Sequence, residues 1–340
     1  DDDLDLIAIN DFSQFVTPNV LWRNVGREAS GLPRFVAESE SVGLDLRVYG
    51  MGLAVGDLDE NGRNDYFVTN VGAPALLEMS EQGRFVPNAR GTHLRYGAEL
   101  NLVTWVTRMV DLDRDGHLDV LAAVGKLTAA AFIDNPVRTQ PLWLRGQADG
   151  SLKVTTGALE IVDNSGRDFA FTDVDGDGRP ELVVVHIHGG VSVMRDTASP
   201  PLATTLVLTP SATGPGAAGA FVTLRCGDVT RTRTVVAGGD YGNDDAGEVE
   251  VSFPPPCDGP GLTLTGQVRW PSGYVQSVVV TTGARTAIGE PPWLTVTPGG
   301  LEVDLSGHAG AFEAIALEAF GAVEVGASVL RGSWLGPVRE

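Results

Sequence analysis

Three short segments of the sequence repeat one pattern of oxygen-bearing side chains. They read DLDENGRND at 57–65, DLDRDGHLD at 111–119 and DVDGDGRPE at 173–181. In each, positions 1, 3, 5 and 9 carry a carboxylate or carboxamide, and position 6 is glycine, which lets the backbone turn sharply. Such a loop can direct several oxygens at one centre, and Ca²⁺ takes about six to eight oxygen ligands. The pattern predicts three calcium sites.

The predicted ligands are the side chains at positions 1, 3, 5 and 9 and the backbone carbonyl at position 7. The first loop would use Asp57, Asp59, Asn61, the carbonyl of Arg63, and Asp65. The second loop would use Asp111, Asp113, Asp115, the carbonyl of His117, and Asp119. The third loop would use Asp173, Asp175, Asp177, the carbonyl of Arg179, and Glu181. The turn position is occupied by Gly62, Gly116 and Gly178.

The residues around these loops indicate strands. An EF-hand loop begins similarly, but it needs a bidentate Glu at position 12 and a helix on each side. Position 12 is Val68, Ala122 and Val184, and apolar segments rich in β-branched residues flank each loop. Acidic turns on a solvated surface are the alternative, which would explain one copy better than three copies in the same register.

A fourth, incomplete copy opens the chain. The segment DDDLDLIAIN aligns with positions 5 to 9 and the following strand, so Asp1, the carbonyl of Asp3, and Asp5 would form a partial site. Position 9 recurs about every 60 residues, at Asp5, Asp65, Asp119 and Glu181. Each unit has room for about four short strands, which is the content of one blade of a β-propeller.

We therefore predict an all-β protein with three parts. Propeller blades with calcium loops would occupy 1–197, with the first repeat truncated; a small β domain would occupy 202–290; and a sandwich-like β module would occupy 291–340. The segment 311–320 has a periodicity that also suits a short helix, although strand is expected. Four loops are few for a closed ring, so we expect residues before Asp1, rather than another chain, to complete it.

Charge and cysteine content restrict the function and the compartment. The net charge is −20 at pH 7, which argues against nucleic acid or an anionic membrane as a partner. The two cysteines, Cys226 and Cys257, are predicted to pair, with two buried thiols as the alternative. A disulfide favours an oxidising compartment. The sequence contains no membrane-spanning segment, and any export signal would lie outside it.

Two sequence features resemble known families. The DxDxDG loops in units of about 60 residues resemble the FG-GAP/VCBS repeats of integrin-type propellers, as does Gly50-Met51-Gly52 before the first loop. The segment VRWPSGYVQSV at 268–278 resembles the signature of the ASPIC/UnbV domain, which follows such repeats in the cartilage acidic protein family. The resemblance covers about residues 1–290.

The resemblance implies an extracellular or cell-surface protein without enzymatic activity. Its blades would be stabilised by Ca²⁺, and its partner would be a protein or glycan at the cell surface or in the matrix, with self-association as a further option. Two alternatives stay open: a structural subunit of an extracellular assembly or filament, and a propeller-based enzyme that acts on polysaccharides. We find no catalytic motif that favours the enzyme.

Histidine and tryptophan residues provide weaker signals. His186 and His188 would share one side of a strand and could bind zinc or copper, but no third ligand lies nearby in the sequence, so a polar strand face is expected. Trp22, Leu77 and Trp143 are aligned as equivalent positions that pack between blades, and Trp270 is expected to anchor a hairpin, with sugar stacking as the alternative role of these tryptophans.

Overall fold

The structure is a computed structural model. It describes residues 4–28, 32–87, 102–125, 140–155, 159, 166–176, 179–187, 190–197, 203–210, 217–236, 247–290, 294–297, 300–304, 320–325 and 329–334. Several predicted features lie outside these ranges: Asp1, Asp3, Asp177, Gly178, His188 and most of 311–320.

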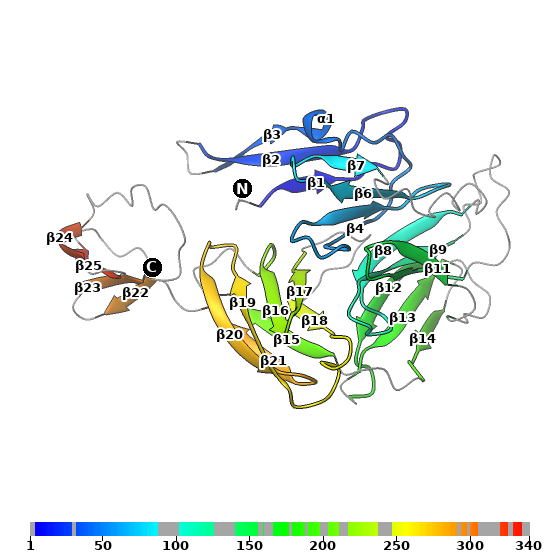
Figure 1. The fold of residues 1–340 in the computed structure, drawn as a ribbon. Helices are drawn as coiled ribbons and strands as arrows, with labels where there is room; N and C mark the ends of the chain where they lie inside the picture. The colour runs from blue at the N-terminus through cyan, green and yellow to red at the C-terminus, as the bar shows by residue number, and fades with distance from the viewer. Residues whose placement is uncertain are drawn as a thin grey trace.

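The first four sheets follow one another along the chain, and we call them repeat sheets 1 to 4 (Figure 1). Repeat sheet 1 contains β1 (Leu6–Ala8), β2 (Val20–Arg27) and β3 (Pro33–Ala37), followed by the helix α1 (Ser39–Val42). Repeat sheet 2 contains β4 (Leu53–Gly56), β5 (Asp65–Val68), β6 (Ala75–Met79) and β7 (Phe85–Pro87). Repeat sheet 3 contains β8 (Thr104–Val110), β9 (Asp119–Val124), β10 (Leu142–Gly146) and β11 (Leu152–Thr155). Repeat sheet 4 contains β12 (Gly166–Thr172), β13 (Glu181–His186) and β14 (Val191–Met194).

Each complete acidic loop joins the first two strands of its sheet. The loops connect β4 to β5, β8 to β9 and β12 to β13, and position 9 is the first residue of the second strand each time. All pairings within these sheets are antiparallel. Repeat sheets 2 and 3 have the predicted four strands, whereas the described part of repeat sheet 1 begins at the counterpart of β5. The sheets are separate, and none of the described sheets closes on itself.

Consecutive repeat sheets bury apolar side chains between them. Leu21 and Leu77 belong to a cluster between sheets 1 and 2, Leu76 and Leu144 to one between sheets 2 and 3, and Trp143 packs between sheets 3 and 4. The strands β4, β8 and β12 lie next to one another along this series. Because burying one such side chain contributes about 1.5–3 kcal/mol, these layers hold the loops in a fixed succession.

The strand register corrects the predicted alignment of the tryptophans. In repeat sheets 1, 2 and 3, the residue directly after position 9 pairs with Trp22, Leu77 and Leu144, respectively. These three residues are therefore the equivalent ones. Trp143 pairs with the second residue after position 9, so its side chain points to the following repeat sheet. The side chain of Trp22 points to the opposite face, away from the repeat sheet that follows its own. The prediction of packing between blades is confirmed for Trp143, whereas it stays a prediction for Trp22, which is 41% exposed on a face that no described sheet covers.

The described residues between 204 and 289 form two sheets around one apolar core, which we call the sandwich. One sheet contains β15 (Thr204–Thr209), β18 (Glu248–Val251) and β21 (Arg285–Gly289), with β15 and β21 parallel. The other contains β16 (Phe221–Cys226), β17 (Val229–Thr234), β19 (Thr263–Arg269) and β20 (Val275–Thr281). Trp270 is buried in this core and its Nε1 donates a hydrogen bond to Gln276, next to the turn that connects β19 to β20, as predicted.

The predicted disulfide is confirmed. Cys226, at the end of β16, is bonded to Cys257, and both sulfur-bearing side chains lie at the sandwich core. The bond spans 31 residues of sequence and links β16 to the segment that follows β18.

The C-terminal strands form a single sheet. They are β22 (Leu294–Thr297), β23 (Gly300–Asp304), β24 (Phe320–Val325) and β25 (Val329–Trp334). We expected a sandwich-like module here, but the described residues provide one four-stranded sheet. Over the described residues, no helix has the length and apolar character needed to cross a membrane.

Candidate metal centres

The backbone of the acidic loops turns at positions 4 and 6. Glu60 and Arg114 at position 4 have φ of 57°, and Gly62 and Gly116 at position 6 have φ of 83° and 94°. A left-handed conformation costs a residue other than glycine about 1–2 kcal/mol. Hydrogen bonds from the turn to the carboxylate at position 1 offset this cost, since the N–H groups of Gly62 and Gly116 donate to Asp57 at 2.8 Å and Asp111 at 3.0 Å.

Carboxylates come together in all three complete loops. The side-chain oxygens in each group lie within 4.8 Å of one another. The groups are Asp57, Asp59 and Asp65; Asp111, Asp113 and Asp115; and Asp173, Asp175 and Glu181. The structure thus assembles most of the predicted ligand side chains. Asp119 falls outside its group, and Asp5 belongs to none.

Position 1 of the second loop is suited to a cation. Asp111 is 8% exposed; its Oδ2 accepts the hydrogen bond from Gly116, but its Oδ1 has no hydrogen-bond partner among the described residues. Burial raises the pKa of Asp111 to about 7; the charge of Arg233 opposes this effect, and the charges of Asp115 and Asp113 add to it. A buried anionic oxygen needs a partner, and a divalent cation between these carboxylates would provide one.

Position 9 has a structural role that the ligand pattern did not reveal. Both oxygens of Asp119 accept hydrogen bonds: Oδ1 from the N–H of Gly146 at 2.7 Å, and Oδ2 from the N–H of Leu112 at 3.1 Å and from Trp143 Nε1 at 2.9 Å. The carboxylate therefore ties the loop to the third strand of its sheet. Burial raises its pKa to about 7.

The other copies of position 9 make corresponding contacts. Asp65 accepts from the N–H groups of Leu58 at 3.2 Å and Met79 at 3.0 Å. Asp5 accepts from the N–H of Asn24 at 2.7 Å, at the place in β2 that Met79 has in β6. Asp5 is therefore the structural counterpart of Asp65, as the repeat predicts.

Arginines from neighbouring strands compensate part of the negative charge. Arg145 forms ion pairs with Asp113 and with Asp115, the latter at 3.0 Å. Arg195 forms ion pairs with Asp175 and Glu181. Sequence analysis missed both arginines. They occupy equivalent positions in the two repeats, since Arg145 lies near the end of β10 and Arg195 directly follows β14.

Asn61 and the backbone carbonyls at position 7 remain predicted ligands. Asn61 directs its Nδ2 to Asp59 at 2.6 Å and accepts the N–H of Arg63 at its Oδ1 at 2.8 Å. The carbonyls of Arg63, His117 and Arg179 are predicted ligands that no contact in the structure tests.

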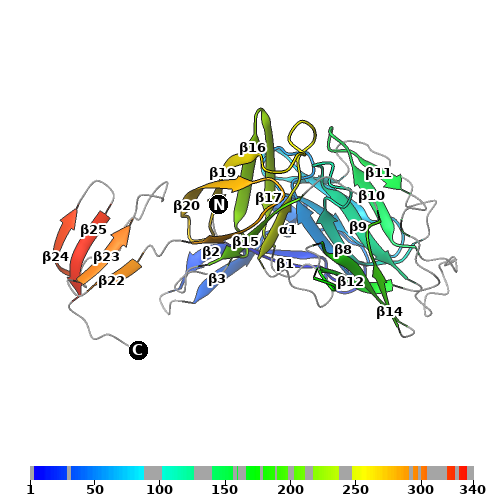
Figure 2. The same ribbon diagram turned by 90° about the horizontal axis from the view of Figure 1, so that it is seen from below.

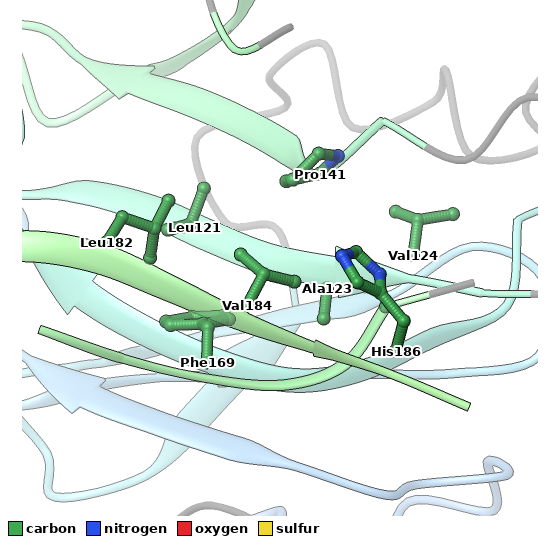
Figure 3. Close-up of a pocket in the computed structure, with 9 residues that line it drawn as sticks. Leu121, Ala123, Val124, Pro141, Phe169, Leu182, Val184 and His186 are labelled. Atoms are coloured by element: carbon green, nitrogen blue, oxygen red, sulfur yellow. The ribbon is translucent and has the colours of Figure 1, made fainter. Parts of the chain in front are cut away.

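His186 lies in a different environment from the one expected. It is buried at the pocket between repeat sheets 3 and 4 that Figure 3 shows, with Ala123, Val124 and Val184 around the ring. Its Nε2 is 2.8 Å from Ser192 Oγ. The prediction of a polar strand face is therefore wrong for His186, because repeat sheet 3 covers this side of β13.

Comparisons with known proteins agree with the repeat structure. A family model described as "FG-GAP-like repeat" matches residues 57–122 and 111–184, which include the three complete loops. The chain is 30% identical to human integrin alpha-IIb over 159 residues, covering 40% of this chain and 14% of the integrin. The chain thus contains FG-GAP-like repeats and corresponds to a small part of the integrin's length.

Proposed function

We propose that this chain, which contains FG-GAP-like repeats, is a calcium-stabilised binding protein of the cell surface or extracellular space. Its repeat sheets would be blades of a propeller-like array, and one Ca²⁺ in each complete loop would fix the turn between the first two strands. The array would then present a rigid surface to a protein or glycan partner. The proposal includes no enzymatic activity.

One observation carries the proposal: three loops converge their carboxylates with the same hydrogen-bond register. In each loop the N–H at position 2 donates to the carboxylate at position 9: Leu58 to Asp65 at 3.2 Å, Leu112 to Asp119 at 3.1 Å and Val174 to Glu181 at 2.8 Å. An acidic surface turn has no need to repeat these bonds. The disulfide supports an oxidising compartment, and the similarity to an integrin α chain supports binding as the activity.

Calcium titration tests the proposal. We expect isothermal titration of the chelator-treated chain to show about three Ca²⁺ per chain, with Mg²⁺ binding more weakly because it demands a tighter octahedral arrangement. Asp111→Asn should remove one site, whereas Asp149→Asn, in an exposed turn of repeat sheet 3, should leave the number unchanged. A titration without heat or with fewer than two sites would contradict the proposal.

We further propose that residues 202–290 are an ASPIC/UnbV-like domain. The support is the WPSG segment, in which Trp270 is a buried anchor and Gly273 has the positive φ of 83° that its turn requires. The buried indole favours packing over sugar binding as the role of Trp270.

Assembly from several copies is the second candidate function. Repeat sheet 4 exposes Val191 and Val193 at 58% and 55%, and repeat sheet 1 exposes Leu6 and Trp22 at 53% and 41%. The strand register places the two valines at positions whose counterparts in repeat sheets 1 to 3 contact the following sheet. It places Trp22 at a position whose counterparts in repeat sheets 2 and 3 contact the preceding sheet. Two copies could therefore pack head to tail, which light scattering would reveal as a mass above 35.7 kDa.

A further inference from the structure

The sandwich contacts the repeat sheets through two buried arginines. Arg231 and Arg233 lie two residues apart on β17, so they point to the same side of the strand. Their exposed fractions are 5% and 6%. β17 lies beside β4, the strand that leads into the first metal loop, and Figures 1 and 2 show the sandwich against the repeat sheets. A buried guanidinium is costly without polar partners, and the loops supply them.

The first loop provides one of these partners and a second hydrogen bond to β17. Arg231 Nη1 forms an ion pair with Glu60 Oε2, and Thr234 Oγ1 donates a hydrogen bond to Asn64 Oδ1 at 2.8 Å. Glu60 and Asn64 are positions 4 and 8 of the loop, which are not predicted ligand positions. A cation in the first loop would therefore leave both contacts available.

The second loop provides a backbone acceptor and close packing. Arg233 Nη2 donates to the carbonyl of Gly116 at 3.2 Å. Arg231 and Pro254 also pack on Gly116, where an added Cβ would lie 3.0 Å from Arg231 Nε and from Pro254 Cδ. Gly116 thus serves both the turn and the approach of the sandwich.

In the first two loops, the side chain at position 4 has the opposite charge to a residue on the sandwich strand that the loop faces. Glu60 of the first loop meets Arg231, whereas Arg114 of the second loop attracts Glu250 on β18. Both residues have the same left-handed backbone conformation, with φ of 57°. The contacts between loops and sandwich therefore depend on the turn geometry that the metal would fix.

We propose that the loop face formed by Glu60, Asn64, Arg114 and Gly116 is the docking surface of the sandwich, and that docking and metal binding are linked. The linkage rests on the metal sites proposed above. Without a cation the clustered carboxylates repel one another, which loosens the turns at positions 4 and 6 and weakens the docking contacts. The effect is reciprocal, so docking strengthens cation binding by the same factor.

Hydrogen exchange of the whole chain tests the linkage. In saturating Ca²⁺ the amides of β17 should be protected, and after chelation they should exchange at least tenfold faster, while β20, in the same sheet but away from the loops, changes less. Calcium binding in the titration with unchanged β17 protection would overturn the linkage alone. Absence of calcium binding would overturn both the linkage and the proposed function.

Two glycines provide a matched pair of variants. Gly62→Ala and Gly116→Ala both place a side chain at a left-handed position 6, but only the methyl group at 116 meets the sandwich, since Gly62 has open space around it. In Ca²⁺, Gly116→Ala should lose β17 protection and Gly62→Ala should retain it. Equal loss in both variants would contradict the docking surface.

A charge exchange tests the pairing at position 4. Arg231→Glu should expose β17 to exchange in Ca²⁺ because it faces Glu60, and Glu60→Arg combined with Arg231→Glu should restore most of the protection. A double variant that stays as unprotected as the single variant would overturn the assigned contact.

Discussion

Positions 1 and 9 of the acidic loops carry the same kind of side chain but have different roles. Asp111 at position 1 keeps one buried oxygen without a partner among the described residues, whereas Asp119 at position 9 accepts hydrogen bonds at both oxygens. We propose that the first binds a cation, whereas the second holds two strands and the loop together whether or not a cation is present. Substitutions should separate these roles.

We expect Asp111→Asn to lower the melting temperature in Ca²⁺ by several degrees and to change it little in chelator. Asp119→Ala should lower the stability in both conditions by roughly 3 kcal/mol, because one buried and two partly buried donors lose their acceptor. Differential scanning fluorimetry with and without Ca²⁺ measures both effects. Equal losses for Asp111→Asn in the two conditions would argue against a metal at that position.

The same carboxylates predict how pH affects the metal-free chain. Burial raises the pKa of Asp111 and of Asp119 to about 7 and that of Asp65 to about 6, from an ordinary value of 3.8. A raised pKa stabilises the fold at low pH, and this contribution is lost as pH rises through the folded-state value. The melting temperature in chelator should therefore fall between pH 5 and pH 8.

Calcium provides the control for this pH dependence. A bound cation compensates the ionised carboxylates, so the decline should be smaller in Ca²⁺ than in chelator. Asp111→Asn should also flatten the decline in chelator, since it removes one titrating group. If the metal-free chain became more stable as pH rose from 5 to 8, the buried acids would not control its stability.

At the element scale, strand register determines what each side chain faces. Trp143 lies between two sheets and Trp22 is exposed, although both follow a proline-led segment of similar sequence. A shift of one residue moves a side chain to the opposite face of a strand. The contacts of Asp5, Asp65 and Asp119 with the third strand reveal the true register.

The disulfide is an element-scale feature with a local effect. Cys226–Cys257 closes a segment of 31 residues, for which the chain-entropy estimate is about 3–4 kcal/mol of stabilisation. We expect Cys226→Ser with Cys257→Ser to lower the unfolding temperature of the sandwich while the number of Ca²⁺ sites stays the same. Calorimetry and calcium titration of the same variant check both points; loss of calcium sites would contradict this separation.

At the scale of the whole molecule, the described repeat sheets leave apolar side chains exposed on repeat sheets 1 and 4. Val193→Asp would block the face of repeat sheet 4, and Trp22→Asp would block that of repeat sheet 1. If copies pack head to tail, each variant alone should be monomeric by light scattering, and an equal mixture should contain dimers. A monomeric unmodified chain in millimolar Ca²⁺ would exclude this mode of assembly.

The negative charge of the molecule is partly compensated within the structure. The net charge is −20, and much of the acidity lies in the three loops and the partial first copy. Arg145 and Arg195 come from the repeat sheets, and Arg231 and Arg233 come from the sandwich. The two parts of the chain are thus joined where like charges are most concentrated.

The sequence alone determined the local features of this protein. The spacing of acidic residues and glycines specified three turns, the apolar segments around them specified strands, and the even number of cysteines indicated a disulfide. These features depend on contacts within a few residues or on side-chain chemistry, so a repeated pattern reveals them. The position of Asp5 in the first repeat was also readable, because it continues the same period.

Only the tertiary structure decided which side chains meet across sheets. It placed His186 in an apolar pocket, assigned Asp119 to the third strand, and brought Arg231 and Arg233 to loops that lie more than a hundred residues earlier in the chain. No periodic pattern encodes such contacts, because they depend on strand register and on how separate sheets pack. The contacts between the sandwich and the acidic loops belong to this second class.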